Sequence, residues 1–204
     1  MKNLIVLVLC FSVNQILFSQ NLKDIDLVSP FNEDLAAVQK NEQWAFINKK
    51  GEKEIDFRDG VVATEINSED PSIKYPIFKE GKCIIKKLID NTYYYGYMDN
   101  KGNTIIEPQF LNVTNFKEGF AIIMKIDTTT IGKNNILSKN VVSYNLEEYV
   151  IDDSGKIIKY LDNGRGYNDA MKSNSLPPSF HSKIIASRLI AVKNKNEKWN
   201  LYSW

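Results

Sequence analysis

The chain has 204 residues, of which 26 are basic and 25 acidic, so its formal net charge at pH 7 is only +1. This balance excludes the electrostatic footprint of a protein that binds nucleic acid or an anionic membrane. A chain of this length can bury an adequate core without disulfides or a structural metal.

Residues 1–20, MKNLIVLVLCFSVNQILFSQ, have the pattern of a secretory signal peptide. Lys2 gives a short positive start, an apolar run follows, and Ser19 is a small residue near the expected cleavage point. Two polar residues interrupt the run, which is too short for a transmembrane helix. We therefore expect cleavage near residue 20 and export of residues 21–204 to the periplasm, the cell surface or the medium.

The two cysteines have separate interpretations. Cys10 lies inside the signal peptide, and lipidation there is disfavoured because the preceding Leu9 is not a small residue. Cys83 is the only cysteine after residue 20, so the exported chain forms no internal disulfide. Cys83 lies in a short apolar strand and is predicted to be a small buried thiol.

A motif of alternating apolar residues that ends in a polar turn recurs along the chain. Its copies are WAFINKKG from Trp44, YGYMDNKG from Tyr95, EYVIDDSG from Glu148 and a truncated WNLYSW from Trp199. The first three copies close on a glycine, at Gly51, Gly102 and Gly155. The four starts are spaced by 51, 53 and 51 residues. Such a period indicates a repeat architecture.

A second signature precedes each motif: a Phe, an acid two residues later, and then a short apolar strand. The copies are FNEDLAAV (31–38), FKEGKCII (78–85), FKEGFAII (116–123) and a weaker IASRLIAV (185–192). Glu80 and Glu118 recur at one place in this signature and are interpreted as structural or solvated. Alternation and Asp/Asn-Gly turns predict β-hairpins, and Pro108 predicts either the end of ladder pairing or an edge strand.

We therefore predict an all-β fold of about four tandem β-hairpin repeats of about 50 residues each. The units lie near residues 27–57, 78–110, 116–160 and 185–204, and residues 126–147 and 161–183 are loop insertions. The units form an open, solenoid-like stack or close into a small propeller, in which the C-terminal strand would pair with the N-terminal one. The open or irregular stack is favoured because the third copy is distorted.

Residues 95–123, YGYMDNKGNTIIEPQFLNVTNFKEGFAII, resemble a repeat of the WG repeat family. The likeness extends over residues 27–204, although no copy keeps an intact Trp-Gly pair. The resemblance implies an array of β repeats, a bacterial and exported protein, and a role in interaction. It implies no catalytic residues, and function has to be argued from a site.

The recurring aromatic residues are predicted to be structural. Trp44, Tyr95 and Trp199 occupy the same motif position, and burial of such large side chains contributes strongly to folding. Tyr93 and Tyr94 precede the motif and lie outside the repeated positions. They are therefore the candidate binding surface.

No catalytic, cofactor-binding or metal-binding residue is predicted, and no cofactor is expected. The segments DNKGN (99–103) and DDSGK (152–156) lack the ligand pattern of a calcium loop and are interpreted as turns. His181, the only histidine, lies in the second insertion and is expected at the surface. A nucleophilic triad would have to use it.

These observations predict an exported, non-enzymatic module that binds a protein or a glycan of the bacterial cell envelope. One alternative is a divergent enzyme that acts on envelope glycans through two carboxylates. Another is a structural spacer without a specific ligand. The binding hypothesis requires an exposed aromatic patch, whereas the spacer hypothesis requires none.

Overall fold

The computed structural model describes residues 22–134, 136–161, 165–166 and 177–204. Within these ranges the chain contains strands and turns and no helix, so the prediction of an all-β protein is confirmed. It follows that no described segment forms a helix able to span a membrane. The predicted signal peptide and residues 162–164 and 167–176 of the second insertion lie outside the described residues.

The described residues contain the following strands, in chain order. They are β1 (Leu27–Val28), β2 (Ala36–Lys40), β3 (Gln43–Ile47), β4 (Lys53–Arg58), β5 (Glu65–Ile66), β6 (Lys74–Tyr75), β7 (Lys82–Ile89), β8 (Thr92–Asp99), β9 (Thr104–Phe110), β10 (Asn112–Val113), β11 (Phe120–Asn134), β12 (Lys139–Asp152), β13 (Ile157–Tyr160), β14 (Arg165–Gly166), β15 (Ser182–Ala186), β16 (Leu189–Lys193) and β17 (Trp199–Ser203).

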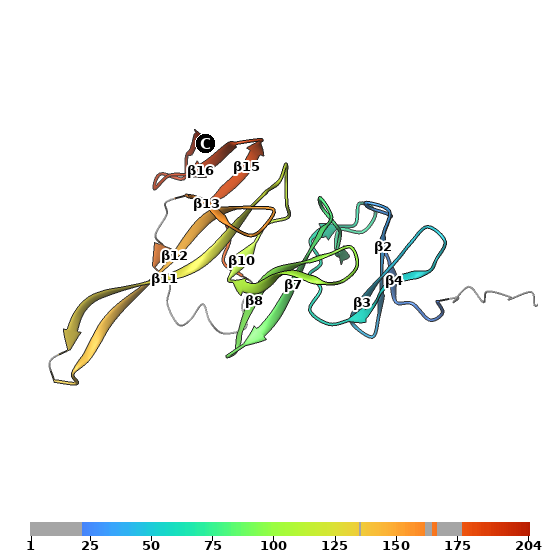
Figure 1. The fold of residues 1–204 in the computed structure, drawn as a ribbon, viewed down its shortest axis with the longest axis horizontal. Helices are drawn as coiled ribbons and strands as arrows, with labels where there is room; N and C mark the ends of the chain where they lie inside the picture. Colours follow the sequence, from blue (N-terminus) through green and yellow to red (C-terminus); the bar gives the residue numbers. More distant parts are fainter. Residues whose placement is uncertain (1–21, 135, 162–164, 167–176) are drawn as a thin grey trace, which may run out of the picture.

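Three-stranded antiparallel meanders are the building units of the described chain (Figure 1). We call β2–β3–β4 meander 1, β7–β8–β9 meander 2, β11–β12–β13 meander 3 and β15–β16–β17 meander 4. Strand β1 extends meander 1, β10 and β14 extend meander 3, and β5 and β6 pair with each other. None of these sheets is closed, and the solenoid-like or propeller arrangement stays a prediction.

The turn after the second strand of each meander is built in the same way. The side-chain oxygen of an Asn or Asp accepts hydrogen bonds from the backbone N–H groups two and four residues later. These turn residues are Asn48, Asp99, Asp152 and Asn194. The residue three positions on has positive φ, which glycine adopts without strain: Gly51, Gly102 and Gly155, but Glu197 in meander 4.

Consecutive meanders pack through apolar faces. The three interfaces contain, in order, Trp44 and Phe46 with Cys83 and Met98, Tyr95 and Tyr97 with Ala121 and Ile151, and Ile122 and Val150 with Ile190 and Val192. Meanders 2 and 3 thus each have two buried faces, one toward each neighbour. Such double-sided burial explains why the two residues before the turn are both apolar in each of these meanders, Tyr97 and Met98 in β8 and Val150 and Ile151 in β12.

The first predicted insertion, residues 126–147, is part of a regular hairpin rather than a loop. Strands β11 and β12 pair from Phe120↔Asp152 to Asn134↔Lys139 with one register shift. The outer half of this hairpin projects from the body of the molecule (Figure 1). Its strands are rich in Thr, Val and Ile, whose branched side chains favour an extended backbone.

The predicted fourth repeat has to be shifted. The turn residue Asn194 places Ile190, four residues earlier, at the position that Trp44 and Tyr95 occupy in meanders 1 and 2. Trp199 lies after the turn, on β17, and 44% of its surface is exposed. The prediction that Trp199 is a buried repeat position is therefore wrong. Trp199 is the same residue type as Trp44, but it follows its turn, whereas Trp44 precedes its own.

Candidate functional site

The acid of the Phe-x-Glu signature links neighbouring meanders. The Glu33 carboxylate accepts hydrogen bonds from the backbone N–H groups of Glu80 at 2.7 Å and Gly81 at 2.8 Å. The Glu80 carboxylate in turn accepts from the N–H groups of Glu118 and Gly119. Each acid therefore holds the next turn, and its recurrence is structural, as the sequence suggested.

The Phe of the same signature packs on the preceding meander. Phe78 meets Phe46 edge to face with ring centroids 4.8 Å apart, and Phe116 meets Tyr97 at the same separation. Such edge-to-face pairs are worth about 0.5–1.5 kcal/mol beyond their buried area. One short signature thus supplies an aromatic contact and a carboxylate clasp across each of the first two interfaces.

The glycine that follows the aromatic motif residue in meander 2 is required by close strand packing. A Cβ on Gly96 would lie 2.3 Å from the backbone oxygen of Ile106 and 2.7 Å from the backbone of Glu107. The side chain of Tyr95 is 7% exposed and packs in the core on the meander 3 side. Trp44 is likewise buried, at 6% exposure. These two residues are scaffold, as predicted.

The two tyrosines before the motif do not form one exposed surface. Tyr93 is 42% exposed, and the Lys86 ammonium lies 4.5 Å from its ring centroid. Tyr94 faces the other side of β8 and packs against the buried Leu111, Met124 and Leu146. Of the two, only Tyr93 is an exposed aromatic residue.

The unusual Glu148, which replaces Trp in the third copy, holds the chain that enters meander 4. Its carboxylate accepts hydrogen bonds from the backbone N–H of His181 at 2.8 Å and from the Ser182 hydroxyl. Glu148 is 1% exposed. His181 is half-buried and its backbone carbonyl also accepts from Lys193. The segment around His181 is thus fixed by a buried acid that an aromatic residue could not replace.

Cys83 is a buried thiol, which confirms its prediction. It has no exposed surface and lies in the interface of meanders 1 and 2. Burial raises the pKa of the thiol, because the charged thiolate loses its hydration. Cys83 is therefore a packing residue and not an activated nucleophile.

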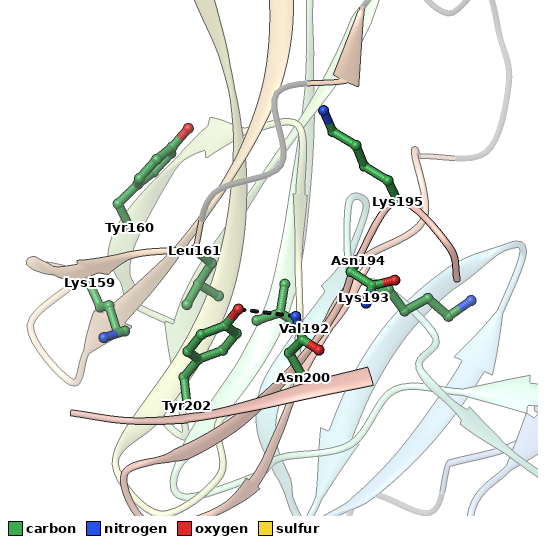
Figure 2. A pocket seen from close by; sticks show the side chains of 9 residues that line it. All are labelled: Lys159, Tyr160, Leu161, Val192, Lys193, Asn194, Lys195, Asn200 and Tyr202. Carbon is green, nitrogen blue, oxygen red and sulfur yellow. Dashed lines mark hydrogen bonds between the residues drawn. The ribbon is translucent and has the colours of Figure 1, made fainter. Parts of the chain in front are cut away.

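A pocket of about 460 Å³ lies between meander 3 and meander 4. Strand β13 and the residue after it form one wall, and the turn and strands β16 and β17 form the other (Figure 2). The lining residues are Lys159, Tyr160, Leu161, Val192, Lys193, Asn194, Lys195, Asn200 and Tyr202. Val192 and Leu161 are buried at its floor, and the Asn200 amide and the Tyr202 phenol lie beside them, whereas the Lys193 and Tyr160 side chains point away (Figure 2).

The pocket is positively charged. Three lysines and no acid of the described residues line it, but the Lys193 ammonium lies on the opposite face of the sheet, 5.5 Å from the Trp199 ring centroid. Lys193 forms an ion pair with Glu197 at 2.7 Å, but neither Lys159 nor Lys195 forms an ion pair with a described residue. The Asn200 amide donates to the Tyr202 hydroxyl at 3.3 Å, so the polar side of β17 is ordered toward the cavity (Figure 2).

These groups could bind an anion that also carries hydroxyls. Ammonium groups contact carboxylate or phosphate, amides and phenols exchange hydrogen bonds with hydroxyls, and the aromatic rings offer apolar surface. The sequence prediction missed the pocket because its walls come from two meanders. The only signal was the dense run KNKNEK (193–198), which surrounds the turn of meander 4.

The fold and its turns define an all-β protein of packed antiparallel meanders. Carboxylate clasps join the first three meanders. The family model described as WG containing repeat matches residues 24–44 and 95–125 of this chain. The resemblance to the WG repeat family is therefore confirmed over these two segments. No curated protein and no solved structure is significantly similar to this chain.

Proposed function

We propose that this protein is an exported interaction module whose pocket between meanders 3 and 4 binds an acidic glycan. One observation carries the proposal: a pocket of about 460 Å³ that no described acid lines and that combines two tyrosines and two asparagines with Lys159 and Lys195, two lysines without an ion pair to a described residue. A cavity of this size falls in the range of small-molecule sites.

The chemistry favours a sugar acid over a neutral sugar or a simple anion. A carboxylate or phosphate on the sugar would pair with Lys159 and Lys195. Hydroxyls would exchange hydrogen bonds with Asn194 and Asn200, and the Tyr202 ring would cover an apolar face of the sugar ring. Because the ammonium groups sit at an open rim, their contribution falls as salt is added.

Export is the second part of the proposal and rests on residues 1–20. Amino-terminal sequencing of the protein from its native host should give a new terminus near Asn21, and the protein should fractionate outside the cytoplasm. An intact Met1 on cytosolic protein would contradict export while leaving the pocket proposal standing.

Binding is tested by calorimetric titration with an oligosaccharide of uronic acids and with its carboxyl-reduced, neutral counterpart. We expect the acidic form to bind and the neutral form to bind at least about tenfold more weakly, which corresponds to 1.4 kcal/mol. The double variant Lys159→Gln, Lys195→Gln should lose this preference. The control Lys50→Gln removes an exposed lysine on meander 1 and should bind like the unmodified chain.

Equal affinity for the two oligosaccharides, or an unchanged preference in the double variant, would contradict the pocket assignment. Absence of any binding would favour the spacer hypothesis. Shortening of the oligosaccharide during the titration would instead favour the enzyme hypothesis.

A further inference from the structure

Strand β17 is the last strand of meander 4, and only one of its edges is paired. It pairs with β16 through five consecutive residues, from Leu189↔Ser203 to Lys193↔Trp199, without a register shift. No other described strand pairs with its outer edge. Its side chains are all exposed, with Leu201 at 61%, Tyr202 at 46% and Trp199 at 44%.

The edge strands of the other meanders carry features that disfavour pairing with another chain. Strand β4 has four charged residues among six, and β9 contains Glu107 and Pro108. The ladders of β4, β9 and β13 with their neighbours all contain register shifts. Charges, proline and bulges are the means by which proteins protect sheet edges. Strand β17 has none of these: its sequence is WNLYS and its ladder is regular.

Alternate residues of β17 direct their backbone groups to that outer edge. The N–H of Trp204 donates to the carbonyl of Arg188 at 3.3 Å, and the N–H of Asn194 donates to the carbonyl of Lys198 at 2.8 Å. Hydrogen-bonded pairs alternate along an antiparallel ladder. The even-numbered residues of β17 therefore bond to β16, whereas the odd-numbered residues, with Leu201 at their centre, direct N–H and C=O outward.

We propose that β17 pairs antiparallel with β17 of a second copy of this chain, which joins two meanders 4 into one continuous sheet. A two-fold axis through the middle of the strand places Leu201 opposite Leu201 of the second copy and Trp199 opposite Ser203 of the second copy. All outward N–H and C=O groups of the three odd-numbered residues then find partners. A two-fold contact of this kind is the commonest in homo-oligomers.

The side chains fit this register on both faces of the sheet. On one face, leucine meets leucine and the Trp199 ring extends the apolar surface. The lysines of that face, Lys183 and Lys193, belong to β15 and β16 and lie over the inner side of Trp199, at 4.6 and 5.5 Å from its ring. No charge therefore meets its own copy at the axis, where like charges would be destabilising.

The opposite face of β17 carries Asn200 and Tyr202. In the same register, Asn200 would stand opposite Tyr202 of the second copy and repeat the amide-to-phenol hydrogen bond seen within the chain at 3.3 Å. This face lines the pocket between meanders 3 and 4, so two pockets would lie on one side of the joined sheet. A charged partner strand has no complementary group at this neutral edge, which favours a second copy.

The molar mass of the full chain in solution, measured by light scattering over a range of concentrations, tests the proposal. We expect a dimer that dissociates on dilution. Leu201→Lys places two ammonium groups opposite each other at the axis and should give a monomer. Ile105→Lys, which changes an exposed apolar residue on the edge strand of meander 2, should remain dimeric.

Two further variants separate strand pairing from misfolding. Leu201→Pro removes an outward N–H and no hydrogen bond of the ladder with β16, so the monomeric variant should keep the far-ultraviolet spectrum of the unmodified chain. A mixture of Leu201→Lys and Leu201→Glu should restore the dimer, although each variant alone is monomeric. A monomeric unmodified chain, or a dimer that persists in Leu201→Lys, would overturn the proposal.

Discussion

Meanders 2 and 4 share their turn chemistry but use opposite faces to contact the preceding meander. In meander 2 the residue just before the turn, Met98, packs against meander 1, and the next inward residue, Tyr97, faces meander 3. In meander 4 the residue just before the turn is Lys193, and it is Val192 that packs against meander 3. Meander 4 is therefore reversed relative to meander 2.

We attribute the difference to the residue just before the turn. Met98 and Ile151 are apolar and enter the interface with the preceding meander. A lysine cannot enter such an interface without losing the hydration of its charge. Lys193 therefore turns outward, and the reversal also buries the opposite face of meander 4 and exposes Trp199, Leu201 and the edge of β17.

The largest expected difference is between Trp44, at the buried motif position of meander 1, and Trp199 of meander 4. Trp44→Ala should lower the free energy of unfolding by about 3–5 kcal/mol, as large-to-small core changes do, because Trp44 is 6% exposed. Trp199→Ala should cost less than about 1 kcal/mol, because Trp199 is 44% exposed. Urea unfolding at low protein concentration measures both. Equal losses would show that the two residues are equivalent after all.

Close strand packing in meander 2 gives the next largest effect. Gly96→Ala should lower the free energy of unfolding by about 1–3 kcal/mol, because the added Cβ meets the backbone of β9 and forces the strands apart. Gly132→Ala in the projecting hairpin of meander 3 is the matched control, since nothing lies within 4 Å of the added atom. If both variants unfold like the unmodified chain, the close approach at Gly96 is not a constraint.

Loss of the carboxylate clasp should have a smaller effect on the free energy of unfolding. Glu80→Ala removes the acceptor for the N–H groups of Glu118 and Gly119 and should cost about 1 kcal/mol, since the exposed groups regain water. Glu118→Ala is the control, because the Glu118 carboxylate holds no further turn among the described residues and the two residues have nearly the same positive φ, 53° and 55°. A larger loss for Glu118→Ala in thermal unfolding would refute the clasp.

Local features of the fold could be predicted from the sequence because they depend on neighbouring residues. Alternation gives strands, an Asn or Asp with a following Gly gives the turns, and Trp44 and Tyr95 are large enough to require burial. Cys83 was predicted to be buried because it lies in a short apolar strand. Each of these inferences needs only a few adjacent letters.

Features that join distant segments could not be predicted. The spacing to the fourth unit is 42 residues, from Glu148 to Ile190, and no aromatic residue marks its start. Trp199 stood near the expected distance and was assigned to the wrong side of a turn. The pocket has walls from β13 and β16–β17, whose contact follows from the reversal of meander 4. In the sequence, only Lys193, just before the turn of meander 4, indicated that reversal.

The smallest expected effect is on the stability of the fold at low pH. It depends on whether the turn residue of a meander is Asn or Asp. Meanders 1 and 4 use Asn48 and Asn194, which do not titrate, whereas meanders 2 and 3 use Asp99 and Asp152. Hydrogen bonds from the Ser154 hydroxyl and from backbone N–H groups lower the pKa of Asp152 below its ordinary 3.8. At Asp99, burial raises the pKa, but hydrogen bonds from Asn103 and from backbone N–H groups lower it by more.

A carboxylate with a lowered pKa in the folded state stabilises the fold above its ordinary pKa, and this contribution is lost as the pH falls through the lower folded value. Unfolding free energies should therefore drop below about pH 4, by a small amount because both groups are largely exposed. The double variant Asp99→Asn, Asp152→Asn keeps the turn acceptors but removes the titration, so its stability should fall less steeply on acidification. An unchanged acid slope in urea unfolding of this variant would show that the titrating groups lie outside these turns.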